Sequence, residues 1–214
     1  MRFKLLACEV LRREIESLIV HSPHQIEVEF LPQQLHAIGR VRMKNRLDEY
    51  LTAVQEDSYD ALLLAYGLCS GGIAGLSAGK IPMVVPRAHD CITFFLGSRQ
   101  KYQDYFFANG GTYFMTTGWF EFDNALNYGV EMMPFYNKIA FIETGLEPDG
   151  SFVHRARTIA EERDWAFEKI PADLSLLQRL LNGDWNDDFL IIPPGQRIHE
   201  SYDDDVINCE PLQN

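Results

Sequence analysis

Three of the four cysteines in this 214-residue chain follow short apolar runs that predict buried β-strands. Cys8 ends the run FKLLAC, Cys69 follows DALLLAYGL, and Cys91 follows PMVVPRAHD. Neighbouring parallel strands bring their carboxyl ends to one edge of a sheet, which is where open α/β sheets bind their ligands. We therefore predict that the three thiols converge on one metal or iron–sulfur site.

Three thiolates from separate loops suit a zinc ion or a [4Fe-4S] cluster that keeps one coordination position open. The sequence has no Cys-x-x-Cys pair and no cysteine-rich cluster motif, so this prediction depends on the convergence alone. Two alternatives stay open. Each cysteine can be a small core hydrophobe, or Cys69 alone can be a reactive thiolate. Cys209 lies apart, in a polar C-terminal segment.

The segment RAHDC places several chemically useful side chains next to Cys91. We assign proton transfer to His89 and Asp90, because imidazole and carboxyl groups move protons near neutral pH. Arg87 is predicted to bind an anionic part of the substrate. The alternatives are a structural role for His89 and a helix N-cap role for Asp90.

The segment GLCSGG follows a strand and lacks the Lys-Ser/Thr ending of a Walker A loop. Successive backbone N–H groups there would bind an anion at a helix start, and the alternative is a plain strand-to-helix turn. We predict that Gly67 and Gly71 contribute to substrate binding. Ser98, followed by Lys101, is predicted to line the same pocket.

Apolar runs and helical spacing alternate along the chain. The predicted strands cover residues 3–8, 25–31, 60–66, 82–85, 112–116, 138–143, 166–170 and 189–192. The predicted helices cover residues 9–20, 42–56, 72–78, 92–107, 122–136, 152–165 and 174–182. This alternation predicts an α/β fold, with a mostly parallel Rossmann-like sheet covered by helices on both faces.

Two domain organisations fit this pattern. Residues 1–196 can form a single α/β domain, or two similar halves, 1–118 and 137–196, because segments 4–9 and 138–144 open similar units. Residues 197–214 are rich in aspartate and glutamate, which predicts an acidic C-terminal tail.

The formal net charge is −12 and no stripe of lysine and arginine compensates for it, so we expect no nucleic-acid binding. No run reaches the ~20 apolar residues that cross a bilayer, and the first residues do not resemble a signal peptide. We therefore predict a cytoplasmic protein with reduced thiols, and a homodimer by analogy with other α/β proteins.

The motifs YGLCSGG, PRAHDCITFFLGS and GDWNDDFLIIPPG, with the opening ACEVL, resemble the family called domain of unknown function 1638. The resemblance covers roughly residues 3–196. It implies an association with corrinoid-dependent methyl transfer in methanogens and anaerobic bacteria, and no established activity. The family pattern falls on these residues: Cys8, Gly67, Cys69, Arg87, His89, Asp90, Cys91, Gly97, Ser98 and Tyr102.

The leading prediction is an enzyme, a lyase or a transferase, that acts on a small anionic or methylated substrate. Cys8, Cys69 and Cys91 would hold its metal ion or [4Fe-4S] cluster. The first alternative is a non-catalytic accessory protein that serves a corrinoid methyltransferase. The second is a transferase or hydrolase that depends on one thiol, that of Cys69.

Overall fold

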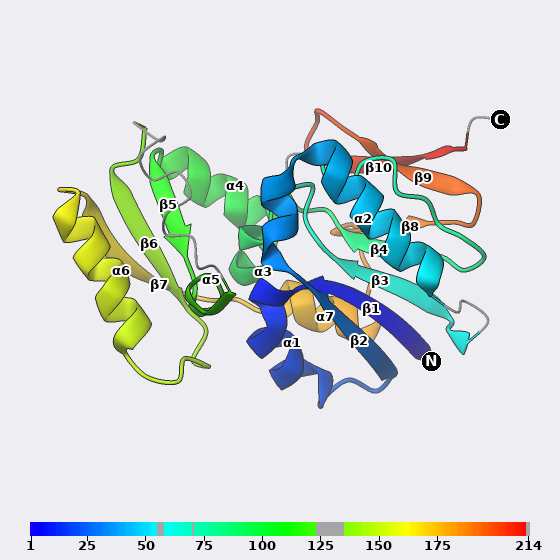
Figure 1. Ribbon diagram of the computed structural model, residues 1–214, viewed down its shortest axis with the longest axis horizontal. Coiled ribbons are helices and arrows are strands. Elements are labelled where there is room, and N and C mark those ends of the chain that lie inside the picture. The colour runs from blue at the N-terminus through cyan, green and yellow to red at the C-terminus, as the bar shows by residue number, and fades with distance from the viewer. Residues whose placement is uncertain (55–57, 70, 123–134, 213–214) are drawn as a thin grey trace.

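The computed structural model describes residues 1–54, 58–69, 71–122 and 135–212 (Figure 1). All eight predicted strands are present, with bounds shifted by at most two residues. They are β1 (Arg2–Cys8), β2 (Gln25–Leu31), β3 (Ala61–Ala65), β4 (Met83–Pro86), β5 (Thr112–Met115), β6 (Lys138–Glu143), β7 (Ala166–Pro171) and β8 (Phe189–Ile192).

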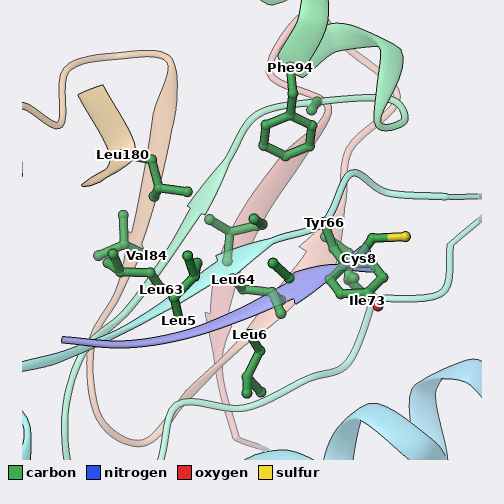
Figure 2. Close-up of a cluster of buried hydrophobic side chains, with 14 of the residues drawn as sticks. Leu5, Leu6, Cys8, Leu63, Leu64, Tyr66, Ile73, Val84, Phe94 and Leu180 are labelled. Carbon is green, nitrogen blue, oxygen red and sulfur yellow. The ribbon is translucent and has the colours of Figure 1, made fainter. Parts of the chain in front are cut away.

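The main sheet has five strands in the order β2-β1-β3-β4-β8. The first four are parallel, and β8 pairs antiparallel with β4. Every residue of β3 is buried, as its continuous apolar sequence predicts for a strand covered on both faces. Figure 2 shows part of the core that β1 and β3 form with Val84, Phe94 and Leu180. The α/β prediction with a mainly parallel sheet is therefore confirmed.

Helices lie on both faces of this sheet. In Figure 1, α2 (Arg40–Ala53) lies in front of it and α7 (Ser175–Asn182) behind it. α2 buries Met43 and Leu47, and α7 buries four leucines against α1 (Arg12–Ile19) and β4. Two short 3₁₀ helices, η1 (Glu9–Leu11) and η2 (Gln33–Ile38), follow the carboxyl ends of β1 and β2.

A second sheet contains the parallel strands β5, β6 and β7, with β6 in the centre. It packs α6 (Ser151–Glu162) over a separate small core. The short helix α5 (Thr117–Phe122) contacts η1, which joins the two sheets beside the carboxyl end of β1. Since β5 pairs with β6, and β8 returns to the first sheet, a division into residues 1–118 and 137–196 does not follow the sheets.

Two helix predictions are wrong. Residues 72–78 form no helix: 72–75 are turns and Ser77 forms an isolated bridge with Arg197, in keeping with the positive φ angles of Gly71 and Gly75. The predicted helix 92–107 is two helices, α3 (Ile92–Leu96) and α4 (Arg99–Ala108), divided at Gly97, whose φ is 83°. The predicted helix 122–136 lies almost entirely outside the described residues, and α5 was not predicted.

The predicted acidic tail differs from the structure. Most of it forms an antiparallel hairpin of β9 (Gln196–Glu200) and β10 (Ile207–Pro211). Ile198, Val206 and Ile207 are buried, and backbone hydrogen bonds join β9 to residues 75–78. The few apolar residues between the carboxylates therefore anchor this segment. In the described ranges, no helix has the length and apolar character that a membrane span requires.

Candidate functional site

The carboxyl ends of β1, β3 and β4 meet at one edge of the main sheet. β1 and β3 are parallel neighbours, with Ala7 opposite Ala65. The next residues of these two strands, Cys8 and Tyr66, therefore lie beside each other, as Figure 2 shows at the edge of the buried cluster. This neighbourhood follows directly from the strand register.

Backbone hydrogen bonds hold the loops after β3 and β4 together. Leu68 N donates to Ala88 O at 2.8 Å, and Cys69 N donates to His89 O at 2.9 Å. Gly67 is necessary for this contact, because a Cβ atom there would lie 2.6 Å from the Cα atom of Asp90. The two loops therefore deliver the second and third cysteines of the chain to the same place.

Cys69 has a φ angle of 46°, in the left-handed region that residues other than glycine rarely adopt. Such a conformation costs on the order of 1–3 kcal/mol and persists only where the surrounding structure imposes it. Here the hydrogen bond from Cys69 N to His89 O helps to impose it. The strain therefore lies at a residue whose thiol faces a cavity.

Cys8, Cys69 and Cys91 all line one cavity of about 280 Å³ between the sheet edge, η2 and α5. Its wall is completed by the following residues: Val10, Gln33, His36, Ala65, Tyr66, Gly67, His89, Asp90, Ile92 and Trp119. The structure thus brings the three predicted thiols together, along with Gly67, His89 and Asp90.

The electrostatic environment keeps these thiols protonated. Burial raises the pKa of Cys8 to about 11. Burial also raises the pKa of Cys69 and of Cys91, and the charge of Asp90 and those of the neighbouring thiols add to the effect. No lysine or arginine is among the described residues that line the cavity. These surroundings therefore favour thiols over thiolates at neutral pH.

Asp90 has the helix N-cap role that was the alternative from the sequence, and it also accepts a hydrogen bond from a tyrosine. Its Oδ1 accepts a hydrogen bond from Ile92 N at 2.9 Å, which caps the start of α3. Its Oδ2 accepts from the Tyr102 hydroxyl at 3.1 Å, and burial raises the pKa of the carboxyl group. His89 is exposed at the cavity and stacks on the Tyr102 ring with 5.7 Å between centroids. One face of its imidazole thus remains accessible.

The sequence model of the family DUF1638, described as a protein of unknown function, matches residues 30–181 of the chain. The chain belongs to this family. The matched segment includes Cys69 and Cys91 and begins after Cys8. No curated protein and no solved structure matches the chain. Family membership therefore carries no activity, and the function has to be argued from the site.

Three residues of this DUF1638 chain that were assigned to substrate binding lie elsewhere. The Arg87 guanidinium donates to the carbonyl oxygens of Asp205 and Ile207, so it holds the C-terminal hairpin. Gly71 faces the Arg40 side chain. The Ser98 hydroxyl accepts from Lys101 N at 3.2 Å and caps α4. None of the three is among the residues that line the thiol cavity.

Two buried polar groups in the cavity were not singled out from the DUF1638 sequence. Gln33 is 2% exposed and Tyr66 is 3% exposed. Within the described residues, Gln33 Nε2 has no hydrogen-bond partner, and the Tyr66 hydroxyl has none other than the neighbouring Cys8 thiol. An unpaired buried donor is costly and a thiol is only a weak acceptor, so both groups are free to donate to a better acceptor.

Trp119 also escaped prediction, although it follows the strand 112–115. Gly118 lets α5 approach η1, because a Cβ atom there would lie 2.1 Å from Val10 O. The approach positions Trp119 as a wall of the cavity. Over the described part of this DUF1638 chain, no three His, Cys, Asp or Glu side chains form a ready metal site as they stand.

Proposed function

We propose that Cys8, Cys69 and Cys91 bind a thiophilic metal ion or an iron–sulfur cluster, and that the protein is an enzyme acting on a small molecule beside it. The observation that carries this proposal is the meeting of three thiols in one cavity that has no lysine or arginine among its described lining residues. Among the described residues, the side chains do not form a ready metal site, so binding of a shared metal would require the three thiols to move closer together.

The raised thiol pKa values favour a cationic cofactor over a lone nucleophile. A reactive cysteine needs a neighbouring cation or a helix N-terminus that lowers its pKa. Burial and acidic neighbours act in the opposite direction on Cys69. A metal cation supplies the positive charge that the protein lacks here, and it binds the thiolate form directly. This comparison weakens the single-thiol alternative.

The position of the cavity supports the same proposal. The parallel strands run in the order β2-β1-β3-β4. From β1 the chain first adds β2 on one side, and it then crosses over to add β3 and β4 on the other side. In Rossmann-like sheets this reversal between the first and third strands is where ligands bind, outside the carboxyl ends. Cys8 and Tyr66 stand at that point. We take this part of the sheet as Rossmann-like for that reason.

The remaining groups divide into two roles. Gln33 and Tyr66 would donate hydrogen bonds to an oxygen atom of the substrate, which is a better acceptor than the Cys8 thiol beside Tyr66 and would satisfy the unpaired Gln33 amide. His89 would exchange a proton with the substrate through its accessible imidazole, and Asp90 would hold Tyr102 and the loop in place. A bound metal would polarise the substrate as a Lewis acid.

Metal analysis of protein purified without oxygen tests the proposal, combined with titration of the apoprotein with Cd²⁺ followed by sulfur-to-cadmium charge-transfer absorbance. We expect stoichiometric metal, or iron with sulfide. Replacing any one of Cys8, Cys69 and Cys91 by serine should sharply weaken Cd²⁺ binding. Cys209→Ser is the matched control, because Cys209 lies on β10 and does not line the cavity.

Equal Cd²⁺ binding by the wild type and all three cavity variants would overturn the metal proposal. Circular dichroism spectra of the variants would distinguish a lost site from a lost fold. The homodimer, the methylated substrate and the service to a corrinoid methyltransferase stay predictions. Co-purification of a methyltransferase subunit with this chain would support the last of them.

A further inference from the structure

A second cavity, of about 540 Å³, adjoins the thiol cavity. Asp90, Ile92 and Trp119 line both, so the two cavities share part of their wall, and we refer to them together as the cleft. The second cavity lies between α4, β5 and the start of β6. Its other described lining residues are Tyr102, Phe106, Gly111, Thr112, Tyr113, Phe114, Phe135 and Tyr136.

Aromatic rings dominate this second cavity and are already arranged for stacking. The Tyr102 and Phe106 rings are nearly parallel, with 6.1 Å between centroids and 7° between planes. His89 continues the stack from the side of the thiol cavity. Tyr113 and Tyr136 meet edge to face, with 5.2 Å between centroids. Such a ladder presents flat faces and edges to a ligand.

The charges in the cleft restrict the ligand further. Within the described residues, neither cavity is lined by a lysine or an arginine. Asp90 lies at the junction of the two cavities, and its two oxygens already accept hydrogen bonds. A phosphate or carboxylate placed here would be desolvated beside the Asp90 carboxyl group, with histidines but no lysine or arginine among the described lining residues to balance its charge. The cleft therefore disfavours anions. Arg87 does not change this, because its guanidinium group donates hydrogen bonds to carbonyl oxygens of the C-terminal hairpin.

We infer that the aromatic cavity binds a flat aromatic or heteroaromatic ring without negative charge, and that this ring is the recognition part of the ligand whose reacting end enters the thiol cavity. The unpaired donor of Gln33, with the Tyr66 hydroxyl that has only the Cys8 thiol beside it, favours a reacting end that carries an acceptor oxygen. This inference rests on the proposed function for the reacting end only. Ring recognition depends on the aromatic wall and not on the metal.

Three two-ring probes test it by titration calorimetry at pH 8: quinoline, which is neutral, N-methylquinolinium, which is cationic, and naphthalene-2-carboxylate, which is anionic. Stacking on an aromatic side chain is worth ≈ 1–3 kcal/mol, so Phe106→Ala should weaken quinoline binding roughly tenfold. The matched control is Phe107→Ala, because Phe107 is 82% exposed and does not line the cavity. The anionic probe should bind at least about tenfold more weakly than quinoline.

Tetramethylammonium provides the opposing probe, since it is a cation without a ring. If it binds as tightly as N-methylquinolinium, the aromatic wall is a cation cage and the ring inference is overturned. Equal binding of the anionic and neutral probes, or equal losses in the two phenylalanine variants, would overturn it as well. Cd²⁺ binding by Phe106→Ala separates the two proposals: it should stay unchanged, whereas the cysteine variants should lose Cd²⁺ and keep quinoline.

Discussion

Glu14 is a buried carboxyl group at the joint between the two sheets, and it makes the stability of the protein depend on pH. Its side chain is 1% exposed, and Oε2 has no hydrogen-bond partner in the part of the chain that the structure describes. Burial raises the pKa of Glu14 from 4.5 to about 7, and the nearby carboxylate of Glu147 adds to the increase. The Thr144 side chain offsets part of it.

The sign follows from proton binding. Between pH 4.5 and 7 the folded protein holds a proton on Glu14 that the unfolded chain has lost, so the free energy of unfolding falls as pH rises through this range. A pKa difference of this size corresponds to roughly 3 kcal/mol as an upper limit. Glu14→Gln should therefore stabilise the protein by up to about 3 kcal/mol at pH 8 and by little at pH 4.5.

Urea unfolding at pH 5 and pH 8 measures this difference. The matched control is Glu16→Gln on the same helix, because Glu16 is exposed and pairs with Arg12 at 3.4 Å. An exposed pair of this kind contributes about 0–1 kcal/mol, so the control should change little at either pH. A gain for Glu14→Gln that is the same at both pH values would refute the assignment of a buried, protonated carboxyl group.

Three further substitutions test the packing around the site. Gly67→Ala should destabilise the protein by about 3 kcal/mol in thermal or urea unfolding, because its Cβ atom would collide with the Asp90 backbone, whereas Gly150→Ala meets no atom within 4 Å and should be nearly neutral. Phe95→Ala should cost about 3–5 kcal/mol, since Phe95 is 0% exposed. Arg87→Met should speed proteolysis within the β9–β10 hairpin and leave Cd²⁺ binding unchanged.

The strands were predictable because their sequences are governed by burial. β3 and β6 are almost wholly buried, and their uninterrupted apolar runs carry that information locally. The pairing of strands is not local. Nothing in the run 112–116 indicates that it pairs with β6 rather than with the main sheet. The eight predicted strands, assigned to one sheet or to halves 1–118 and 137–196, therefore lie in two sheets that neither option describes.

The residues of the candidate site that directly follow a strand were predictable from the sequence. Cys8 and Cys69 follow from the rule that ligands bind outside the carboxyl ends of parallel strands. The same rule applies to Gln33, which follows β2, but an isolated glutamine carries no sign of chemistry in the sequence. Only its burial without a hydrogen-bond partner distinguishes it.

Arg87 shows where sequence proximity misleads. It stands two residues from His89, which suggested a shared role, yet Arg87 N donates to Asp188 O at 2.7 Å and so continues the pairing of β4 with β8. That pairing directs its guanidinium to the hairpin, where the carbonyl oxygens of Asp205 and Ile207 accept its hydrogen bonds. The direction of a side chain whose backbone is paired in a sheet is set by that pairing, and not by the chemistry of its neighbours in the sequence.

Because Arg87 does not line the cleft, the chemistry available there differs from the chemistry predicted from the sequence. With an arginine present, the cavity would hold anions and could lower the pKa of its own thiols. Without one, the described lining residues include one carboxyl group, two histidines, thiols, neutral donors and rings, but no lysine or arginine. A metal ion of the kind proposed above would supply positive charge at the thiols, and each sulfur would release its proton on binding it. The aromatic cavity would then have only to exclude anions and hold a ring, which its composition favours.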